Sequence, residues 1–165
     1  MTLSIDENVQ SALLRLGAPY DVLPCDPDYA DTARFCERYG VAPEETGNTI
    51  LVASKTDPKK YAACLVLATT RLDGNHTVAR LLGVKRLSFA AAEETRALTG
   101  MMVGGVTVFG LPEEIPIYID SRVMLLPSIV LGGGSRSGKI RIAPEALRGL
   151  PGAIVVEGLA LEKGA

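Results

Sequence analysis

The chain has 165 residues, of which 47% are hydrophobic, and its formal net charge is −2 at pH 7. This size and apolar content suit one core, and no linker-like stretch or repeat divides the sequence, so we expect a single domain over residues 1–165. The balanced charge excludes the extended basic face that grips long nucleic acids, so no DNA partner is expected and an RNA partner would be met over a small patch.

The first predicted element is an amphipathic helix. The segment Ser4-Ile5-Asp6-Glu7 has the pattern of a capping box with its serine as the cap, and Gly17 provides a stop. Apolar residues at helical spacing lie between these signals. A short strand is expected over residues 20–23, followed by a second helix that is capped by Asp31 and ends at Gly40.

Two near-continuous apolar runs, residues 49–53 and 61–67, predict central strands that are buried on both faces. Asp57-Pro58 turns the chain between them, so we expect the two strands to pair as a hairpin. A third helix is predicted from Asp73 to Gly83, and an extended piece follows over residues 84–89.

The second half of the chain predicts mostly strands around a glycine-rich loop. A helix over residues 90–98 is closed by Gly100, and the stretch 100–110, with its four glycines and two methionines, is typical of a functional loop. The remaining expected elements are a strand over 115–119, apolar sheet over 125–131 ended by Gly132, a strand over 140–142, a helical turn over 144–147 and a last strand over 153–156. Short helices mixed with several strands predict an α/β (α+β) domain with a mixed sheet.

The segment Gly133-Gly134-Ser135-Arg136-Ser137-Gly138-Lys139 fits the first seven positions of a phosphate-binding loop. Ile140 replaces the hydroxyl residue that would hold magnesium, and the alternation after it predicts a strand where that motif requires a helix. We therefore interpret the segment as a glycine-rich turn that lines a cleft and places Arg136 and Lys139 near a phosphate.

Other catalytic and metal-binding patterns are missing from the sequence. His76 is the only histidine, and its place at a helix start is more typical of a structural residue. There is no Gly-x-Ser-x-Gly elbow. Cys25, Cys36 and Cys64 are odd in number and share no Cys-x-x-Cys spacing, which argues against disulfides and zinc. We expect no metal.

Two features of the sequence predict where in the cell the protein is located. Its N-terminus carries the acidic pair Asp6-Glu7 where a signal peptide carries positive charge. No apolar run reaches the roughly 20 residues that span a bilayer. We therefore expect a cytoplasmic protein without a membrane partner.

Four segments together carry a family resemblance. They are Asn48-Thr49-Ile50-Leu51-Val52, Thr99–Leu111, Ile117-Tyr118-Ile119-Asp120 and Gly132–Pro144. In this order they resemble the K-T-hydrophobic strand, the tG-x-x-x-GG-x-[ST]-P-[FL]-G loop, the strand ending in Asp and the glycine-rich segment of the YbaK/EbsC family. These proteins are free-standing relatives of the prolyl-tRNA synthetase editing domain.

The resemblance implies a mixed, strongly curved β-sheet flanked by short helices, with a pocket formed by the glycine loops. It implies hydrolysis of the ester between an amino acid and the terminal adenosine of a tRNA, without a metal or organic cofactor. Oriented backbone N–H groups can stabilise the developing oxyanion in such a reaction. The implied partners are the aminoacylated acceptor end of a tRNA and, beyond it, an aminoacyl-tRNA synthetase.

The resemblance also implies the site residues. Asn48 and Thr107 occupy its catalytic positions. The implied substrate-binding residues are Gly104, Gly105, Val106, Val108, Asp120, Gly132, Gly133, Gly134, Ser135, Arg136 and Lys139.

The sequence departs from the family pattern at two positions. Asn48 stands where the family has lysine, so it can hydrogen-bond but carries no charge, and Val108 stands where the loop has proline. Two interpretations therefore stay open. One is a trans-acting aminoacyl-tRNA deacylase helped by Arg136 or Lys139. The other is a non-catalytic binding module of the same fold that recognises an aminoacyl-adenosine, a nucleotide or a protein partner.

Overall fold

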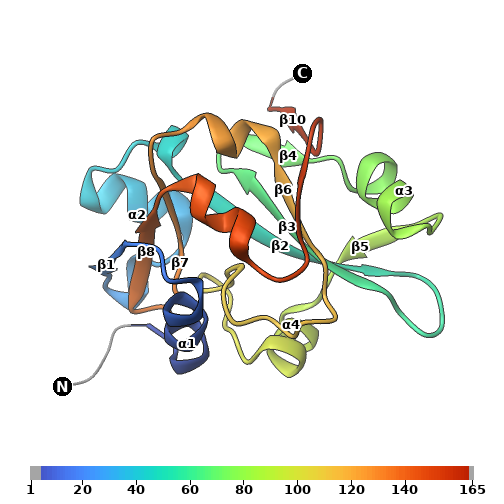
Figure 1. The fold of residues 1–165 in the computed structure, drawn as a ribbon, viewed down its shortest axis with the longest axis horizontal. Helices are drawn as coiled ribbons and strands as arrows, with labels where there is room; N and C mark the ends of the chain where they lie inside the picture. Colours follow the sequence, from blue (N-terminus) through green and yellow to red (C-terminus); the bar gives the residue numbers. More distant parts are fainter. Residues whose placement is uncertain (1–4, 164–165) are drawn as a thin grey trace.

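The centre of the molecule is an antiparallel hairpin. In the computed structural model, which describes residues 5–163, β2 (Gly47–Ser54) and β3 (Tyr61–Leu67) pair along their whole length and cross the middle of the fold (Figure 1). Their buried side chains alternate between two apolar clusters, because Leu51 and Leu65 belong to one while Val52 belongs to the other. The predicted hairpin, buried on both faces, is confirmed.

Three further strands complete a five-stranded sheet of order β5-β2-β3-β6-β9. β5 (Leu87–Phe89) runs antiparallel to β2, whereas β6 (Ile117–Asp120) runs parallel to β3, and β9 (Ala153–Val156) runs parallel to β6. This mixture of parallel and antiparallel pairs, together with the short helices, confirms the predicted α/β (α+β) class with a mixed sheet.

The remaining described strands belong to two smaller sheets. β1 (Tyr20–Pro24), β8 (Gly138–Ile142) and β7 (Ile129–Gly132) form one, in the order β1-β8-β7. β4 (Thr70–Leu72) and β10 (Ala160–Glu162) form the other. A strongly curved sheet is therefore not supported; the strands are divided among three hydrogen-bonded sheets.

Among residues 5–163, each of the four α-helices ends at a glycine that the sequence predicted as its stop. α1 (Glu7–Leu16), α2 (Thr32–Tyr39), α3 (Ala79–Leu82) and α4 (Ala92–Thr99) are each followed by a glycine with a left-handed backbone. A left-handed residue satisfies the last carbonyl groups of a helix, and glycine adopts it without strain. α1 and α4 lie along the lower side of the view, and α2 lies beside β8 and β7 (Figure 1).

Two local predictions are corrected. Asp6 caps α1 through its Oδ1 atom, which accepts from the backbone N–H of Asn8 at 2.8 Å, while the predicted cap Ser4 lies outside the described residues. The apolar stretch 125–131 is a strand only from Ile129, because it begins at the end of a 3-10 turn (Ser121–Leu125) and Pro127 cannot donate to a ladder.

Candidate active-site cavity

A cavity of about 460 Å³ lies where the edge of β2 meets the glycine loops, which is a usual size for a small-molecule site. Its wall combines the start of β2, the first residues of α2 and α4, and the loop that follows α4. The lining residues are Asp31, Thr32, Gly47, Asn48, Thr49, Ile50, Leu51, Phe89, Ala90, Ala92, Thr95, Val103, Gly104, Val106, Gly132 and Lys139. Five residues that the sequence implied for the site, Asn48, Gly104, Val106, Gly132 and Lys139, therefore meet around one space.

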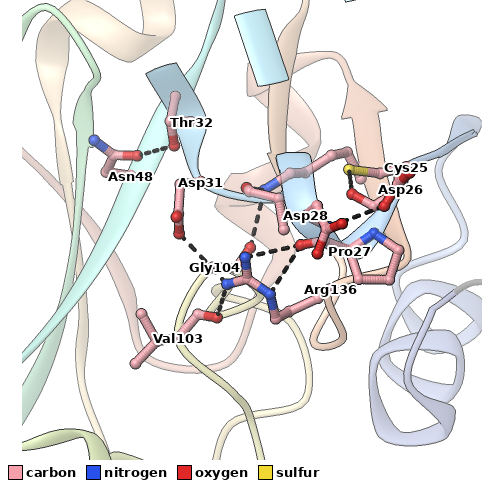
Figure 2. A network of polar contacts seen from close by, with 12 residues as sticks. Cys25, Asp26, Pro27, Asp28, Asp31, Thr32, Asn48, Val103, Gly104 and Arg136 are labelled. Carbon is pink, nitrogen blue, oxygen red and sulfur yellow. Dashed lines mark hydrogen bonds and ion pairs between the residues drawn. The ribbon is translucent and has the colours of Figure 1, made fainter. Parts of the chain in front are cut away.

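Arg136 hydrogen-bonds to two loops at the rim of this cavity. Its Nε and Nη2 atoms donate to the Pro27 carbonyl oxygen at 3.1 and 2.8 Å, and Nη1 donates to the Val103 carbonyl oxygen at 2.7 Å. Nη1 also lies 3.4 Å from Oδ1 of Asp31 (Figure 2). A planar guanidinium can donate to several acceptors at once, because its N–H groups point in fixed, separate directions. Arg136 therefore fixes the relative position of the segment before α2 and the loop after α4.

Lys139 is a buried cation in the cavity wall. Its side chain is 6% exposed, and Nζ donates to the carbonyl oxygens of Ala30 at 2.6 Å and Gly104 at 2.9 Å. The ion pairs formed among residues 5–163 do not include it. Burial lowers the pKa of its ammonium below the ordinary 10.5, although the nearby Cys25 thiol and Asp31 carboxylate oppose that shift. A buried ammonium without a paired carboxylate favours an anionic ligand.

Asn48 lies at the start of β2 with its side chain turned toward α2. Its Oδ1 accepts the hydroxyl of Thr32 at 2.6 Å, and Figure 2 shows the amide nitrogen on the far side of that contact. In this arrangement the carbonyl end of the amide is occupied and the NH₂ end is directed elsewhere. Asn48 can therefore present two N–H donors at a cavity wall.

The two glycine-rich segments pack backbone against backbone. Gly134 donates its N–H to the Gly105 carbonyl oxygen at 2.7 Å, and a Cβ atom on Gly105 would lie 2.6 Å from the Ser135 carbonyl oxygen. A Cβ on Gly132 would lie 2.5 Å from the Val106 carbonyl oxygen. These glycines bring the loops close enough to close one side of the cavity, because no larger residue fits at that spacing.

Several implied site residues do not line the cavity. Gly133 and Gly134 pack against the start of α1, where the Gly133 carbonyl oxygen accepts the Asp6 N–H at 3.0 Å. Ser135 accepts the N–H of Ser137 at 3.2 Å through its own hydroxyl. These residues hold the turn that carries Arg136 and Lys139.

Thr107, Val108 and Asp120 also lie away from the cavity wall. Thr107 is fully buried, and Val108 borders a different, smaller cavity of about 210 Å³ between α1 and the loop after α4. Asp120 ends β6 as a fully buried carboxylate, 3.5 Å from the Arg122 guanidinium. The backbone of Leu159 and Ala160 hydrogen-bonds to this carboxylate, while its Oδ1 atom has no hydrogen-bond partner among residues 5–163.

Sequence reasoning missed part of the wall. Asp31 was identified only as a helix cap, and Thr49 only as part of a strand, yet both line the cavity. The first residues of α4, Ala92 and Thr95, do so as well. Asp31 precedes α2 as predicted, but its side chain makes no capping hydrogen bond and contacts Arg136 instead. Nothing in the sequence indicated that α4 would cover this edge of β2.

Residues 5–163 hold no cluster of three or more histidine, cysteine, aspartate or glutamate side chains that could bind a metal ion. Within the same residues, no helix has the length and apolar content needed to cross a membrane.

The comparisons with known proteins identify the family. The model of the aminoacyl-tRNA editing domain matches residues 26–150, and the chain belongs to this family. The Enterococcus faecalis protein named "Putative Cys-tRNA(Pro)/Cys-tRNA(Cys) deacylase EbsC" is 24% identical over 124 residues, which make up 74% of this chain and 73% of that protein. The YbaK/EbsC resemblance is thereby confirmed.

Solved structures agree with this assignment. The crystal structure of "a putative trans-editing enzyme for prolyl tRNA synthetase" is 26% identical, with a TM-score of 0.80 and 99% of each chain covered. The crystal structure of a hypothetical protein is 24% identical, with a TM-score of 0.82, and covers 94% of this chain and all of its own. The second likeness concerns the fold alone.

Proposed function

We propose that this protein hydrolyses the ester between an amino acid and the terminal adenosine of a mischarged tRNA. The cavity carries the proposal, because the strand start, the glycine loop and the glycine-rich turn that resemble the editing family all border it. Its volume of about 460 Å³ suits an aminoacyl group with part of its nucleoside. We further propose that the working domain extends over residues 1–165 and that it meets only the acceptor end of the tRNA.

The cavity offers donors where this reaction develops negative charge. Water attacks the ester carbonyl carbon, the carbonyl oxygen becomes an oxyanion, and the bond to the ribose oxygen then breaks as that oxygen takes a proton. The NH₂ group of Asn48 can donate to the oxyanion, and such a donor stabilises the transition state more than the neutral ester. The adjacent ribose hydroxyl can assist the attack of water.

Positive charge in the cavity suits the phosphate of the acceptor end. Lys139 lies in the wall, and Arg136 lies behind the same loop at the rim. Position 48 holds asparagine in place of the family's lysine, and we infer that Lys139 on β8 supplies the cation to the cavity. Thr107, Val108 and Asp120 are buried away from the cavity wall, so we assign them no contact with the substrate.

A second candidate function is a binding module without catalysis. The observation that favours it is the neutral side chain of Asn48, whose carbonyl end is held by Thr32. A site that keeps its cavity and loses a charge can retain affinity for an aminoacyl-adenosine while losing rate. The two candidates differ in turnover, which one assay measures.

The test is deacylation of a panel of mischarged tRNAs by the purified protein, with cysteinyl-tRNA(Pro) included because of the named relative. We expect release of at least one amino acid, and a loss of at least about tenfold in Asn48→Ala because a transition-state donor is removed. Asn48→Lys restores the family residue at the same position. If the wild type does not deacylate any tRNA and Asn48→Lys does, the binding module is favoured. If neither protein deacylates any tRNA, the proposed deacylase is contradicted.

A further inference from the structure

One side of the molecule carries a cluster of exposed cations. They come from the turn between β2 and β3, from α3 and from the segment that leads to β5: Lys55, Lys60, Arg80, Lys85 and Arg86. We call these five residues the basic patch. All five are exposed, and none of them takes part in the ion pairs formed among residues 5–163. Their charges are therefore available to a partner.

Hydrogen bonds hold the two segments of the basic patch against each other. The Lys55 N–H donates to the Arg86 carbonyl oxygen at 3.2 Å, and Nζ of Lys60 donates to the Leu82 carbonyl oxygen at 3.3 Å. The β2–β3 turn projects from the right side of the view, beyond β5 and with α3 above it (Figure 1). The cations therefore share one surface, although they come from segments that are distant in the sequence.

Few acidic side chains offset the charge of the basic patch. Residues 74–92 hold no aspartate or glutamate, and Asp57 is the acid of the β2–β3 turn. Glu94 on α4 is already occupied, because it accepts from Lys59 at 3.0 Å and from the Tyr61 hydroxyl at 2.6 Å. Since the net charge of the whole chain is −2, the patch is a local excess of positive charge. Such an excess attracts polyanions.

An exposed aromatic residue lies between the basic patch and the cavity. Phe89 is the last residue of β5, its side chain is 63% exposed, and both Phe89 and Ala90 line the cavity. Extended chain advances about 3.3 Å per residue, so the backbones of Arg86 and Phe89 are about 10 Å apart. An exposed ring at this place offers a flat apolar face on which a nucleobase can stack. Cations, aromatic face and cavity therefore follow one another along a single stretch of chain.

We propose that the basic patch binds the phosphate backbone of RNA next to its 3′ end, and that Phe89 stacks on a base of that end. Single-stranded RNA is commonly held in this way, with cations on its phosphates and aromatic rings on its bases. The inference rests on the proposed function, which puts the terminal adenosine in the cavity. It adds the direction in which the rest of the RNA leaves the cavity: over β5, toward the β2–β3 turn.

The first experiment measures RNA binding, so that it does not depend on turnover. The probe is an uncharged RNA hairpin with a duplex stem and a single-stranded 3′ end of sequence ACCA, labelled for fluorescence anisotropy. In Lys85→Gln/Arg86→Gln we expect the affinity at low salt to fall by at least about tenfold, because two cations that neutralise phosphates are gone. The slope of log affinity against log salt concentration should become shallower by about 1.5.

Arg15→Gln/Arg38→Gln is the matched control. It removes the same charge from exposed positions on α1 and α2, which Figure 1 shows at the other side of the view from the β2–β3 turn. We expect its affinity and salt slope to stay near those of the wild type, because distant surface charges are screened. Both double variants should keep the thermal midpoint, since all four side chains are exposed. Equal losses of affinity in the two double variants, or no binding of the probe by the wild type, would overturn the inference.

Phe89 is tested with a second probe, the same hairpin without its single-stranded end. Phe89→Ala should weaken binding of the ACCA probe by about tenfold, because a stacking face is lost, and should leave binding of the blunt hairpin unchanged. Phe89→Tyr keeps the ring and should bind like the wild type. Leu125→Ala is the control, since Leu125 is 83% exposed but lies outside the cavity wall. If Phe89→Ala binds the ACCA probe like the wild type, or loses both probes equally, the stacking contact is contradicted.

The kind of polyanion and the reaction are separated by further outcomes. Vesicles of phosphatidylserine and phosphatidylcholine offer anionic headgroups without bases. If Lys85→Gln/Arg86→Gln abolishes vesicle binding and leaves RNA affinity unchanged, the basic patch serves a lipid surface and the inference is overturned. RNA binding with the expected pattern, from a protein that hydrolyses no aminoacyl-tRNA, would sustain the inference and contradict the deacylase. Hydrolysis by a protein whose RNA affinity does not depend on the basic patch would do the reverse.

Discussion

At the scale of single residues, the charge of Lys139 depends on its buried surroundings. Burial lowers the pKa of its ammonium, so the folded protein releases this proton at a pH where the unfolded chain still holds it. Between the lowered pKa and the ordinary 10.5 the unfolded state binds more protons. Stability contributed by this residue therefore rises with pH over that window, while any anion held by the ammonium is released.

We predict that the preference of the wild type for adenosine 5′-monophosphate over adenosine falls as the pH rises through the lowered pKa of Lys139. Lys139→Met should reduce this preference by about tenfold at neutral pH and remove its alkaline dependence, because the ammonium is then absent. Calorimetric titrations with the nucleotide and with the nucleoside measure the effect. The exposed Lys163→Met is the control, and a loss in that variant of the same size would contradict a specific role for Lys139.

The sequence located part of the site at this scale. Asn48, Gly104, Gly132 and Lys139 were placed by their resemblance to family segments, and all four line one cavity. The unpaired stretch of one β2 edge, between Thr46 and Val52, was out of reach of the sequence. Residue type does not report that; it follows from where β5 and the bridge at Thr46 stop.

At the scale of elements, the contact between the two glycine loops sets the shape of the cavity. Gly105 and Gly134 share a backbone hydrogen bond of 2.7 Å, and there is no room for a side chain between the loops. We predict that Gly105→Ala destabilises the protein by about 3 kcal/mol, because its Cβ would meet backbone atoms that cannot rotate away. Urea unfolding measures this difference.

Gly17→Ala is the comparison for that prediction. Gly17 has a left-handed φ of 73°, but no described atom other than those of its chain neighbours lies within 4 Å of its Cβ position. Its cost should therefore be the backbone penalty of about 1 kcal/mol alone. Equal losses in the two variants would show that the loops can separate and that their close contact does not limit the fold.

Elements were predictable where the local signal was strong. The β2–β3 hairpin followed from two apolar runs, and the four helix ends followed from glycines. β4 and β10 were missed, since three residues are too few to show a period. The two parallel pairs, β3 with β6 and β6 with β9, could not be foreseen either, because each joins segments that are distant in sequence.

At the scale of the whole molecule, Asp120 and Arg122 connect the five-stranded sheet to the small sheet near the C-terminus. Nη1 of Arg122 lies 3.5 Å from the Asp120 Oδ2 and donates to the Ala160 carbonyl oxygen at 2.7 Å. Burial raises the pKa of the Asp120 carboxyl above the ordinary 3.8, and Arg122 opposes the shift. The folded state therefore holds this proton more readily than the unfolded state. Stability falls as the pH rises from the ordinary pKa of 3.8 to the raised pKa of the folded protein.

We predict that Asp120→Asn removes this acidic dependence and is no less stable than the wild type at neutral pH, because a buried charge is replaced by a neutral isostere. Arg122→Met should instead lower stability, since it leaves the Asp120 carboxylate buried without its cation. Urea unfolding of the three proteins between about pH 4 and about pH 8 separates these outcomes. A large neutral-pH loss in Asp120→Asn would show that the carboxylate charge itself is required.

Among residues 5–163, one edge of β2 has no neighbouring strand between the bridge at Thr46 and Val52, where the pairing with β5 begins. This gap bears on self-association. A strand edge with free N–H and C=O groups is a template on which other chains can add strands, and proteins commonly cover or charge such edges. Here the gap lies in a recess walled by the first residues of α2 and α4 and by the glycine loop. The walls of this recess stand between the unpaired edge and an incoming strand. The fold thus shields an unpaired strand edge from self-association without placing another strand beside it.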